Sequence, residues 1–128
     1  KYLETSCLKT IVGFLNAKGG TLLIGVSDNG DIIGIYDELK IFYKENLDKI
    51  LLHLKNLIQS RIGKAFYEFI SYKAIKIKGK IIIEVTTKAI KSGNGCYLDE
   101  NSFYVRRNPG TDELKGKELV KYVQDHFK

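Results

Sequence analysis

A chain of 128 residues with 44% hydrophobic residues is long enough to bury one hydrophobic core, and two cores are not expected. Its longest apolar runs, 22–24 and 81–83, fall far short of the ~20 residues of a membrane span, and no charged-then-apolar leader opens the chain, so we expect neither a membrane protein nor an exported one. Lys and Arg outnumber Asp and Glu by 21 to 15, and the net charge of +6 favours polyanionic partners.

The two cysteines, Cys7 and Cys96, lie far apart in the sequence, which excludes a dense disulfide framework and paired CxxC zinc sites. We therefore expect two reduced thiols and a cytoplasmic location. The chain also begins without a methionine and directly with a helical pattern. This beginning favours a single domain, residues 1–128, that is a fragment of a longer protein with further fused domains.

The first half of the chain predicts a helix, a hairpin and a second helix. Apolar residues recur at helical spacing over 3–17, and glycines follow them. Two apolar, β-branched runs, 21–26 and 31–35, are separated by Asp-Asn-Gly at 28–30, which is a strong signal for a hairpin turn. An amphipathic helix is predicted from Asn46, as its N-cap, to Arg61.

The second half predicts a second hairpin, with strands over 68–77 and 80–86 joined by a tight turn. A polar loop over 88–95, a strand over 102–107 and a closing helix over 117–127 follow. The predicted fold class is therefore α+β, with a mostly antiparallel sheet built from two hairpins and a further strand, and with helices packed mainly on one side.

Basic residues gather in the second hairpin, in the loop after it and in the last strand. Strand alternation predicts that Tyr104 and Arg106 share one exposed face, and the lysines are expected on the same exposed strand surface. A ring beside a guanidinium suits nucleic acid, because the ring stacks while the guanidinium donates two hydrogen bonds. The predicted contacts to DNA or RNA are Tyr104, Arg106, Arg107, Lys73, Lys76, Lys78, Lys88 and Lys91. The alternative is a solvated face whose lysines serve solubility and edge protection.

Acidic residues and histidines indicate no metal site. A divalent-metal nuclease needs two or three converging carboxylates, whereas Asp28 and Asp31 flank a turn in which Asp commonly caps local amides. His53 and His126 lie in separate predicted helices without clustered ligands. The segment 16–21 lacks the spacing of a phosphate loop and runs from helix to strand, so no cofactor is expected.

Two blocks of the sequence carry a longer pattern. The first is FLNAKGGTLLIGVSDNG at 14–30, followed by Ile-Gly-Ile at 33–35, and the second is FYVR at 103–106 with TDEL at 111–114. They resemble the blocks "AFxNxxGGxLLIGVxDxG" and "FYVRxxxxTxEL" of the Schlafen AlbA-type domain family. The positions that match the family's first motif are Asn16, Gly19, Gly20, Gly25, Asp28, Gly30 and Gly34.

This resemblance implies a DNA-binding or RNA-binding module inside a larger protein, which is a transcriptional regulator, a defence protein or an enzyme. The alternative interpretation of the motif is purely structural: its glycines serve turns and close packing, and Asn16 caps a helix end. A departure from the family is Asp112, where relatives often carry arginine, with Pro109 in the preceding turn. The departure implies weaker anion affinity at this place.

Two other functions stay open. Some eukaryotic Schlafens cleave transfer RNA with two glutamates and an aspartate, and Asp28 matches that aspartate. The matching glutamates, on the family's first strand, would precede Lys1, so the resemblance implies nuclease activity only if the parent protein supplies them, and the chain alone is not expected to be an enzyme. The other alternative is a protein-interaction or homodimerisation module that uses a sheet edge or the 117–127 helix.

Overall fold

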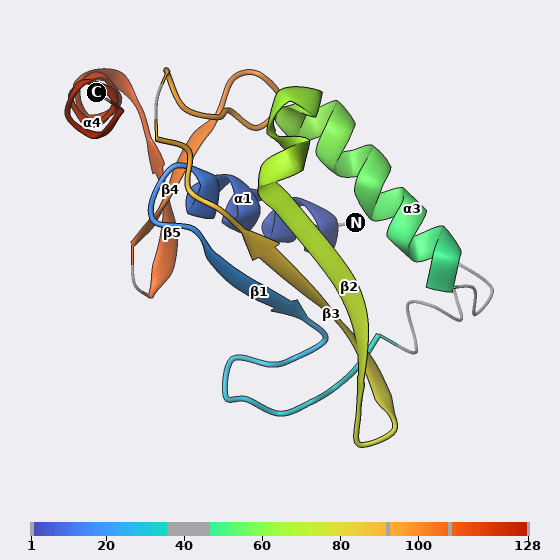
Figure 1. The fold of residues 1–128 in the computed structure, drawn as a ribbon. Coiled ribbons are helices and arrows are strands. Elements are labelled where there is room, and N and C mark those ends of the chain that lie inside the picture. The colour runs from blue at the N-terminus through green and yellow to red at the C-terminus, as the bar shows by residue number, and fades with distance from the viewer. Residues whose placement is uncertain (1, 36–46, 92, 108, 128) are drawn as a thin grey trace.

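Two antiparallel sheets and three α-helices make up the part of the chain that the computed structural model describes, residues 2–35, 47–91, 93–107 and 109–127 (Figure 1). The elements are α1 (Tyr2–Leu15), β1 (Gly20–Ile24), α3 (Leu47–Leu57), the π-helical η1 (Ile58–Gly63), the 3₁₀-helical η2 (Lys64–Phe69), β2 (Ile70–Ile77), β3 (Lys80–Thr87), β4 (Phe103–Arg107), β5 (Gly110–Leu114) and α4 (Gly116–His126). The predicted α+β class is confirmed. Among these residues no helix has the length and apolar character that crossing a bilayer requires.

The larger sheet has three strands in the order β1-β3-β2, and both of its pairings are antiparallel. The smaller sheet is the β4–β5 hairpin, which is separate from the first. Figure 1 shows α1 and α3 on the same side of the larger sheet, as predicted, and α4 standing beyond β4. The strands around α1 therefore form two separate sheets and not one continuous sheet.

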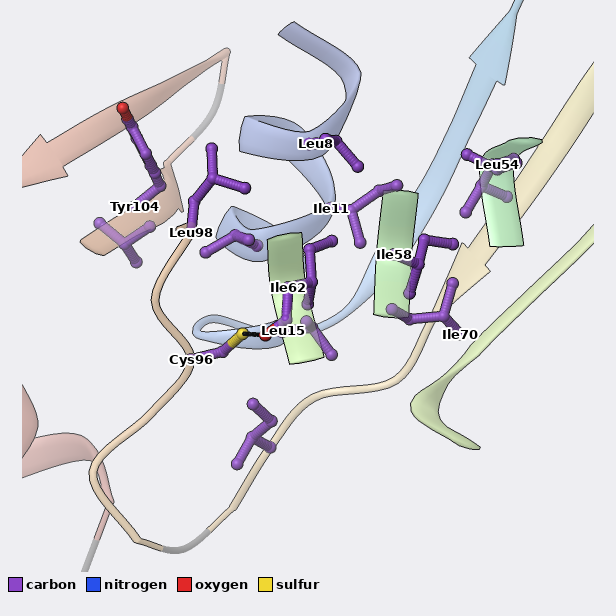
Figure 2. Close-up of a cluster of buried hydrophobic side chains, with 14 of the residues drawn as sticks. Leu8, Ile11, Leu15, Leu54, Ile58, Ile62, Ile70, Cys96, Leu98 and Tyr104 are labelled. Carbon is purple, nitrogen blue, oxygen red and sulfur yellow. Dashed lines mark hydrogen bonds between the residues drawn. The ribbon is translucent and has the colours of Figure 1, made fainter. Parts of the chain in front are cut away.

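Helix α1 lies at the centre of the core. Its side chains Leu8, Ile11 and Leu15 are at most 1% exposed and face the row Leu54, Ile58 and Ile62 of α3 and η1 in Figure 2. Burying an aliphatic side chain of this size stabilises the fold by about 1.5–3 kcal/mol. Cys96 belongs to the same core, and burial raises the pKa of its thiol to about 12. Within the described residues, neither Cys7 nor Cys96 forms a disulfide.

The predicted first hairpin forms only in part. Strand β1 ends at Ile24, and the backbone N–H groups of Ile33 and Gly34 both donate to the carbonyl of Gly25. The backbone N–H of Ile35 then donates to Ile81 on β3. The segment 31–35 is therefore not a strand, because the chain leaves β3 after Ile24 and returns to it only at Ile35.

Two further parts of the chain differ from the predicted secondary structure. The predicted 46–61 helix is α-helical from Leu47 to Leu57 and continues as η1, while its predicted N-cap, Asn46, lies outside the described residues. Strand β5 was not predicted, because Gly, Asp and Glu are all depleted in strands. It forms by pairing with β4, where Leu114 opposes Phe103.

Candidate nucleic-acid interface

An open pocket of about 450 Å³ lies where the C-terminal end of α1 meets β4 and α4. We call it the basic pocket, and its lining residues are Phe14, Ala17, Lys18, Gly19, Val105, Arg106, Arg107, Tyr122 and His126. Three of them, Lys18, Arg106 and Arg107, are cations that come from two distant parts of the sequence. The pocket therefore brings together positive charge and aromatic rings, which is the combination with which proteins bind single-stranded nucleic acid.

Arg106 is held in place by two neighbours. Its Nη1 donates a hydrogen bond of 3.0 Å to the hydroxyl of Thr111, the residue opposite it on β5. Its guanidinium carbon lies 5.5 Å from the ring centroid of Phe14, which is 9% exposed. Because a guanidinium carries five N–H donors, the Thr111 bond leaves donors that can bind an anion.

Arg107 has weaker restraints. Its Nη1 lies 3.6 Å from a carboxylate oxygen of Asp112 and 3.8 Å from one of Glu118. All three side chains are about half exposed, with 47%, 54% and 63% of their surface accessible, so these ion pairs contribute little stability. Asp112 thus lies beside an arginine of the pocket, where its charge competes with a bound anion.

Tyr122 and His126 form the wall that α4 contributes. Their rings are stacked, with centroids 4.9 Å apart and an interplanar angle of 16°. The Tyr122 hydroxyl donates to the backbone carbonyl of Asn16, and its ring packs edge-on against Phe103. Burial raises the pKa of this phenol, an effect that Arg107 partly opposes, so the hydroxyl keeps its proton and its role as donor.

Asn16 has a structural role that differs from a helix cap. Its side chain is 0% exposed, and Nδ2 donates to the carbonyls of Cys96 and Tyr104 at 2.8 Å each. Its Oδ1 accepts the backbone N–H of Cys96, also at 2.8 Å. The Asn16 side chain therefore joins α1, β4 and the segment before β4, and it is not available to a ligand.

The motif glycines next to the pocket serve close packing. Gly19 has a φ of +77°, and a Cβ atom there would lie 2.6 Å from the carbonyl oxygen of Thr87. A Cβ atom on Gly20 would lie 2.5 Å from the Phe14 ring. Because both residues are glycines, the chain can pass close to Thr87 and to the Phe14 ring without displacing that ring.

The prediction that Tyr104 is an exposed stacking ring is wrong. The residue is only 8% exposed, and the Lys9 ammonium of α1 lies 5.5 Å from its ring centroid. Phe103 and Val105 are buried as well, so side chains on both faces of β4 are covered. Alternation along a strand could not reveal this, because the covering helix comes from another part of the chain.

The predicted single basic strand surface is also wrong. Arg106 and Arg107 lie on the β4–β5 sheet, whereas Lys73 and Lys76 lie on β2 of the larger sheet. Strand alternation puts Lys73 and Lys76 on opposite faces, and Lys73 pairs with Glu84 across the strands at 3.8 Å. Neither Lys73 nor Lys76 lines the basic pocket.

The other predicted lysines divide between the two ends of the larger sheet. Lys78 occupies the β2–β3 turn with a φ of +51°. Lys88 and Lys91 follow β3, where the backbone N–H of Ile90 donates to the carbonyl of Leu15 at 2.8 Å. This bond places the segment of Lys88 and Lys91 beside the end of α1, on the side of the basic pocket.

Asp28 is exposed and lies in the turn between Ser27 and Asp31, whose backbones are joined by a 2.9 Å hydrogen bond. It is not one of the residues that line the basic pocket. Within the described residues, no group of three or more His, Cys, Asp or Glu side chains could hold a metal ion.

Sequence reasoning missed Lys18, Tyr122 and His126 as parts of the site. Tyr122 and His126 are four residues apart on the closing helix, and this spacing places two side chains on one helix face. That signal shows that the two rings are neighbours. It does not show that they face Arg106.

The comparisons with known proteins concern the family and the fold. The family model described as "Schlafen, AlbA_2" matches residues 1–115, so α4 lies outside the matched residues. No curated protein matches the chain. A crystal structure of the DIP2311 protein from Corynebacterium diphtheriae is similar to the chain, with a TM-score of 0.65 and 18% sequence identity, over 96% of this chain and 20% of that one. At this identity the likeness shows the fold alone, and the present chain spans about a fifth of the length of that protein. The two motif blocks, the confirmed fold class and a family match that covers most of the chain show that it belongs to the Schlafen AlbA_2 family.

Proposed function

We propose that this chain binds nucleic acid, DNA or RNA, by contacting the sugar-phosphate backbone at the basic pocket. The observation that carries the proposal is that Lys18, Arg106 and Arg107 line one open pocket. Arginine suits phosphate because its planar fork donates parallel hydrogen bonds to two oxygens. The net charge of +6 and the membership in the Schlafen AlbA_2 family are consistent with a polyanionic partner.

The balance of charge at the pocket favours an anion. The carbonyl end of α1 contributes the equivalent of about half a negative charge, which Lys18, just after the helix, offsets. Asp112 and Glu118 oppose Arg107, but both are exposed and their contacts are longer than a good charged hydrogen bond. A phosphate that places two of its oxygens against the Arg107 guanidinium displaces these ion-pair contacts at a small cost in free energy.

Lys88 and Lys91 extend the proposed contact surface, because their segment lies beside the end of α1. Lys73, Lys76 and Lys78 remain predicted contacts for a longer nucleic acid that reaches the β2–β3 hairpin. Backbone contacts of this kind give little sequence preference, so we expect a non-specific dissociation constant of about 10⁻⁴ to 10⁻⁶ M and a strong dependence on salt.

The test is a titration of a labelled oligonucleotide, followed by fluorescence anisotropy at several salt concentrations. Lys18→Ala and Arg107→Ala should weaken binding and each should reduce the salt slope by about one. The matched control is Lys55→Ala, which removes the same charge from an exposed position on α3, a helix that contributes no residue to the lining of the basic pocket. Equal effects of all three variants would reject the pocket as the binding surface.

A further inference from the structure

The basic pocket contains two flat polar groups, and each rests on an aromatic ring. The guanidinium of Arg106 lies over Phe14, with 5.5 Å between its carbon and the ring centroid. The imidazole of His126 lies on Tyr122, with centroids 4.9 Å apart and planes within 16°. Both groups belong to the lining of the same pocket.

The supporting rings are fixed by the core. Phe14 is 9% exposed, and the hydroxyl of Tyr122 is bound to the carbonyl of Asn16. The Tyr122 ring also contacts Phe103, which is 1% exposed, edge-on at 5.8 Å. Because these supports are held, little side-chain entropy is lost when a ligand stacks on the outer face of His126 or Arg106.

The shape of the pocket limits what can enter it. A volume of about 450 Å³ lies in the range of small-ligand sites, roughly 300–1,000 Å³. A duplex keeps the faces of its bases stacked inside and offers its backbone and base edges to such a pocket, and moving a base out of the stack costs free energy. An unpaired nucleotide has its base available and does not pay this cost.

We propose that the basic pocket receives one unpaired nucleotide of a single-stranded nucleic acid. Its base stacks on His126, beside Arg106, while a neighbouring phosphate binds Arg107 and Lys18. This inference rests on the proposed function and adds the preference for single strands. The stacking group comes from α4, which lies outside residues 1–115 that match the family model.

The experiment compares one sequence as a single strand and as a duplex, at the same salt concentration, by anisotropy. We expect the single strand to bind about tenfold more tightly. His126→Ala should remove most of this difference, because it weakens the binding of the single strand more than the binding of the duplex. His126→Phe, which keeps a flat ring without the imidazole's hydrogen bonds, should restore it. An oligonucleotide with a single 2-aminopurine should show fluorescence quenched on binding to the native chain and not to His126→Ala.

The outcomes separate the two proposals. His126 is exposed, so both substitutions should leave the fold intact, and circular dichroism checks this. Equal affinity for single strand and duplex, or no effect of His126→Ala, overturns the nucleotide pocket and leaves backbone binding standing. A preference for single strands that is the same in His126→Ala and in native protein also overturns it. Failure of every nucleic acid to bind overturns both.

Discussion

The phenolic hydroxyl of Tyr122 donates a hydrogen bond to the backbone carbonyl of Asn16, and this bond ties the last helix of the chain to the first. Helix α4 has no fully buried side chain within Gly116–His126, and its partly buried side chains Leu119, Tyr122 and Val123 pack against the core. Phe127, the residue after the helix, is 7% exposed and packs edge-on against the Tyr122 ring, which also stacks on the imidazole of His126. The position of the His126 imidazole therefore depends on this hydroxyl.

Tyr122→Phe should loosen α4 without removing the stacked ring. Losing one hydrogen bond costs about 1 kcal/mol, and the buried carbonyl of Asn16 is left without this partner. We expect a decrease of that size in the free energy of unfolding in urea, and faster amide exchange in α4. Tyr67→Phe is a suitable control, because its hydroxyl pairs with Tyr72 at 2.7 Å, away from the pocket. Equal exchange in α4 for native protein and Tyr122→Phe would show that the hydroxyl does not hold the helix.

Asn16→Ala should destabilise the whole domain. The substitution leaves the N–H and the carbonyl of Cys96 and the carbonyl of Tyr104 buried without the Asn16 side chain as partner. Each buried group that loses its partner costs about 1–3 kcal/mol, so the expected loss for the three groups is at least about 3 kcal/mol. Urea unfolding measures it, and Asn101→Ala is the control, because that side chain is exposed and donates a local hydrogen bond to the carbonyl of Asp99. A loss below that of the control would contradict the structural role of Asn16.

Local sequence signals predicted the β2–β3 hairpin well. Alternating apolar residues and the turn at Lys78 and Gly79 act over neighbouring positions, so they can be recognised without knowing the rest of the fold. The helices α1 and α4 begin within about one residue of the predicted starts, for the same reason.

The site could not be predicted in the same way, because it depends on contacts between distant segments. Gly13 is an example, since a Cβ atom there would lie 3.1 Å from the backbone nitrogen of Arg106. This small residue lets α1 lie directly on β4, which covers Tyr104 and leaves Arg106 at the rim of a pocket. Strand alternation treats Tyr104 and Arg106 as equivalent, and only the position of α1 distinguishes them.

Asp112→Asn should strengthen nucleic-acid binding. The carboxylate of Asp112 lies 3.6 Å from Arg107 and competes with phosphate for the same guanidinium. Removing an exposed charge of this kind is worth up to about 1 kcal/mol, so we expect up to about fivefold tighter binding at low salt. Asp48→Asn, an exposed acid on α3, makes the same change in net charge far from the pocket. If both variants bind equally well, the gain comes from net charge and not from Arg107.

The decrease in the free energy of unfolding at acidic pH should depend in part on the carboxyl group of Asp99. Hydrogen bonds from Arg61 at 2.8 and 2.9 Å lower the pKa of the Asp99 carboxyl, although partial burial opposes the shift. Because the folded pKa lies below the unfolded value of about 3.9, the stabilisation is present above that pH and is lost as the pH falls through the folded pKa. The pair is half exposed, with Asp99 at 50%, so its contribution is below about 1 kcal/mol.

Asp99→Asn should therefore lower the melting temperature slightly at neutral pH and reduce its fall on acidification. Thermal unfolding from about pH 7 to about pH 2 measures both effects. Glu100→Gln, at the neighbouring exposed position, is the control. Parallel curves for the native protein and Asp99→Asn would mean that the Arg61 contact does not persist in solution.

Arg106→Lys separates the shape of the guanidinium from its charge. The lysine keeps the positive charge, but it cannot lie flat over Phe14 while donating to Thr111, as Arg106 does. We expect binding of single-stranded nucleic acid to weaken about three- to tenfold, with the salt slope nearly unchanged, because the number of charges that meet phosphate stays the same. Arg107→Lys should weaken binding less, since the ion pairs of Arg107 with Asp112 and Glu118 are long and exposed. Equal, small effects of both substitutions would mean that the pocket senses charge alone, and the geometry of Arg106 over Phe14 would then have no part in recognition.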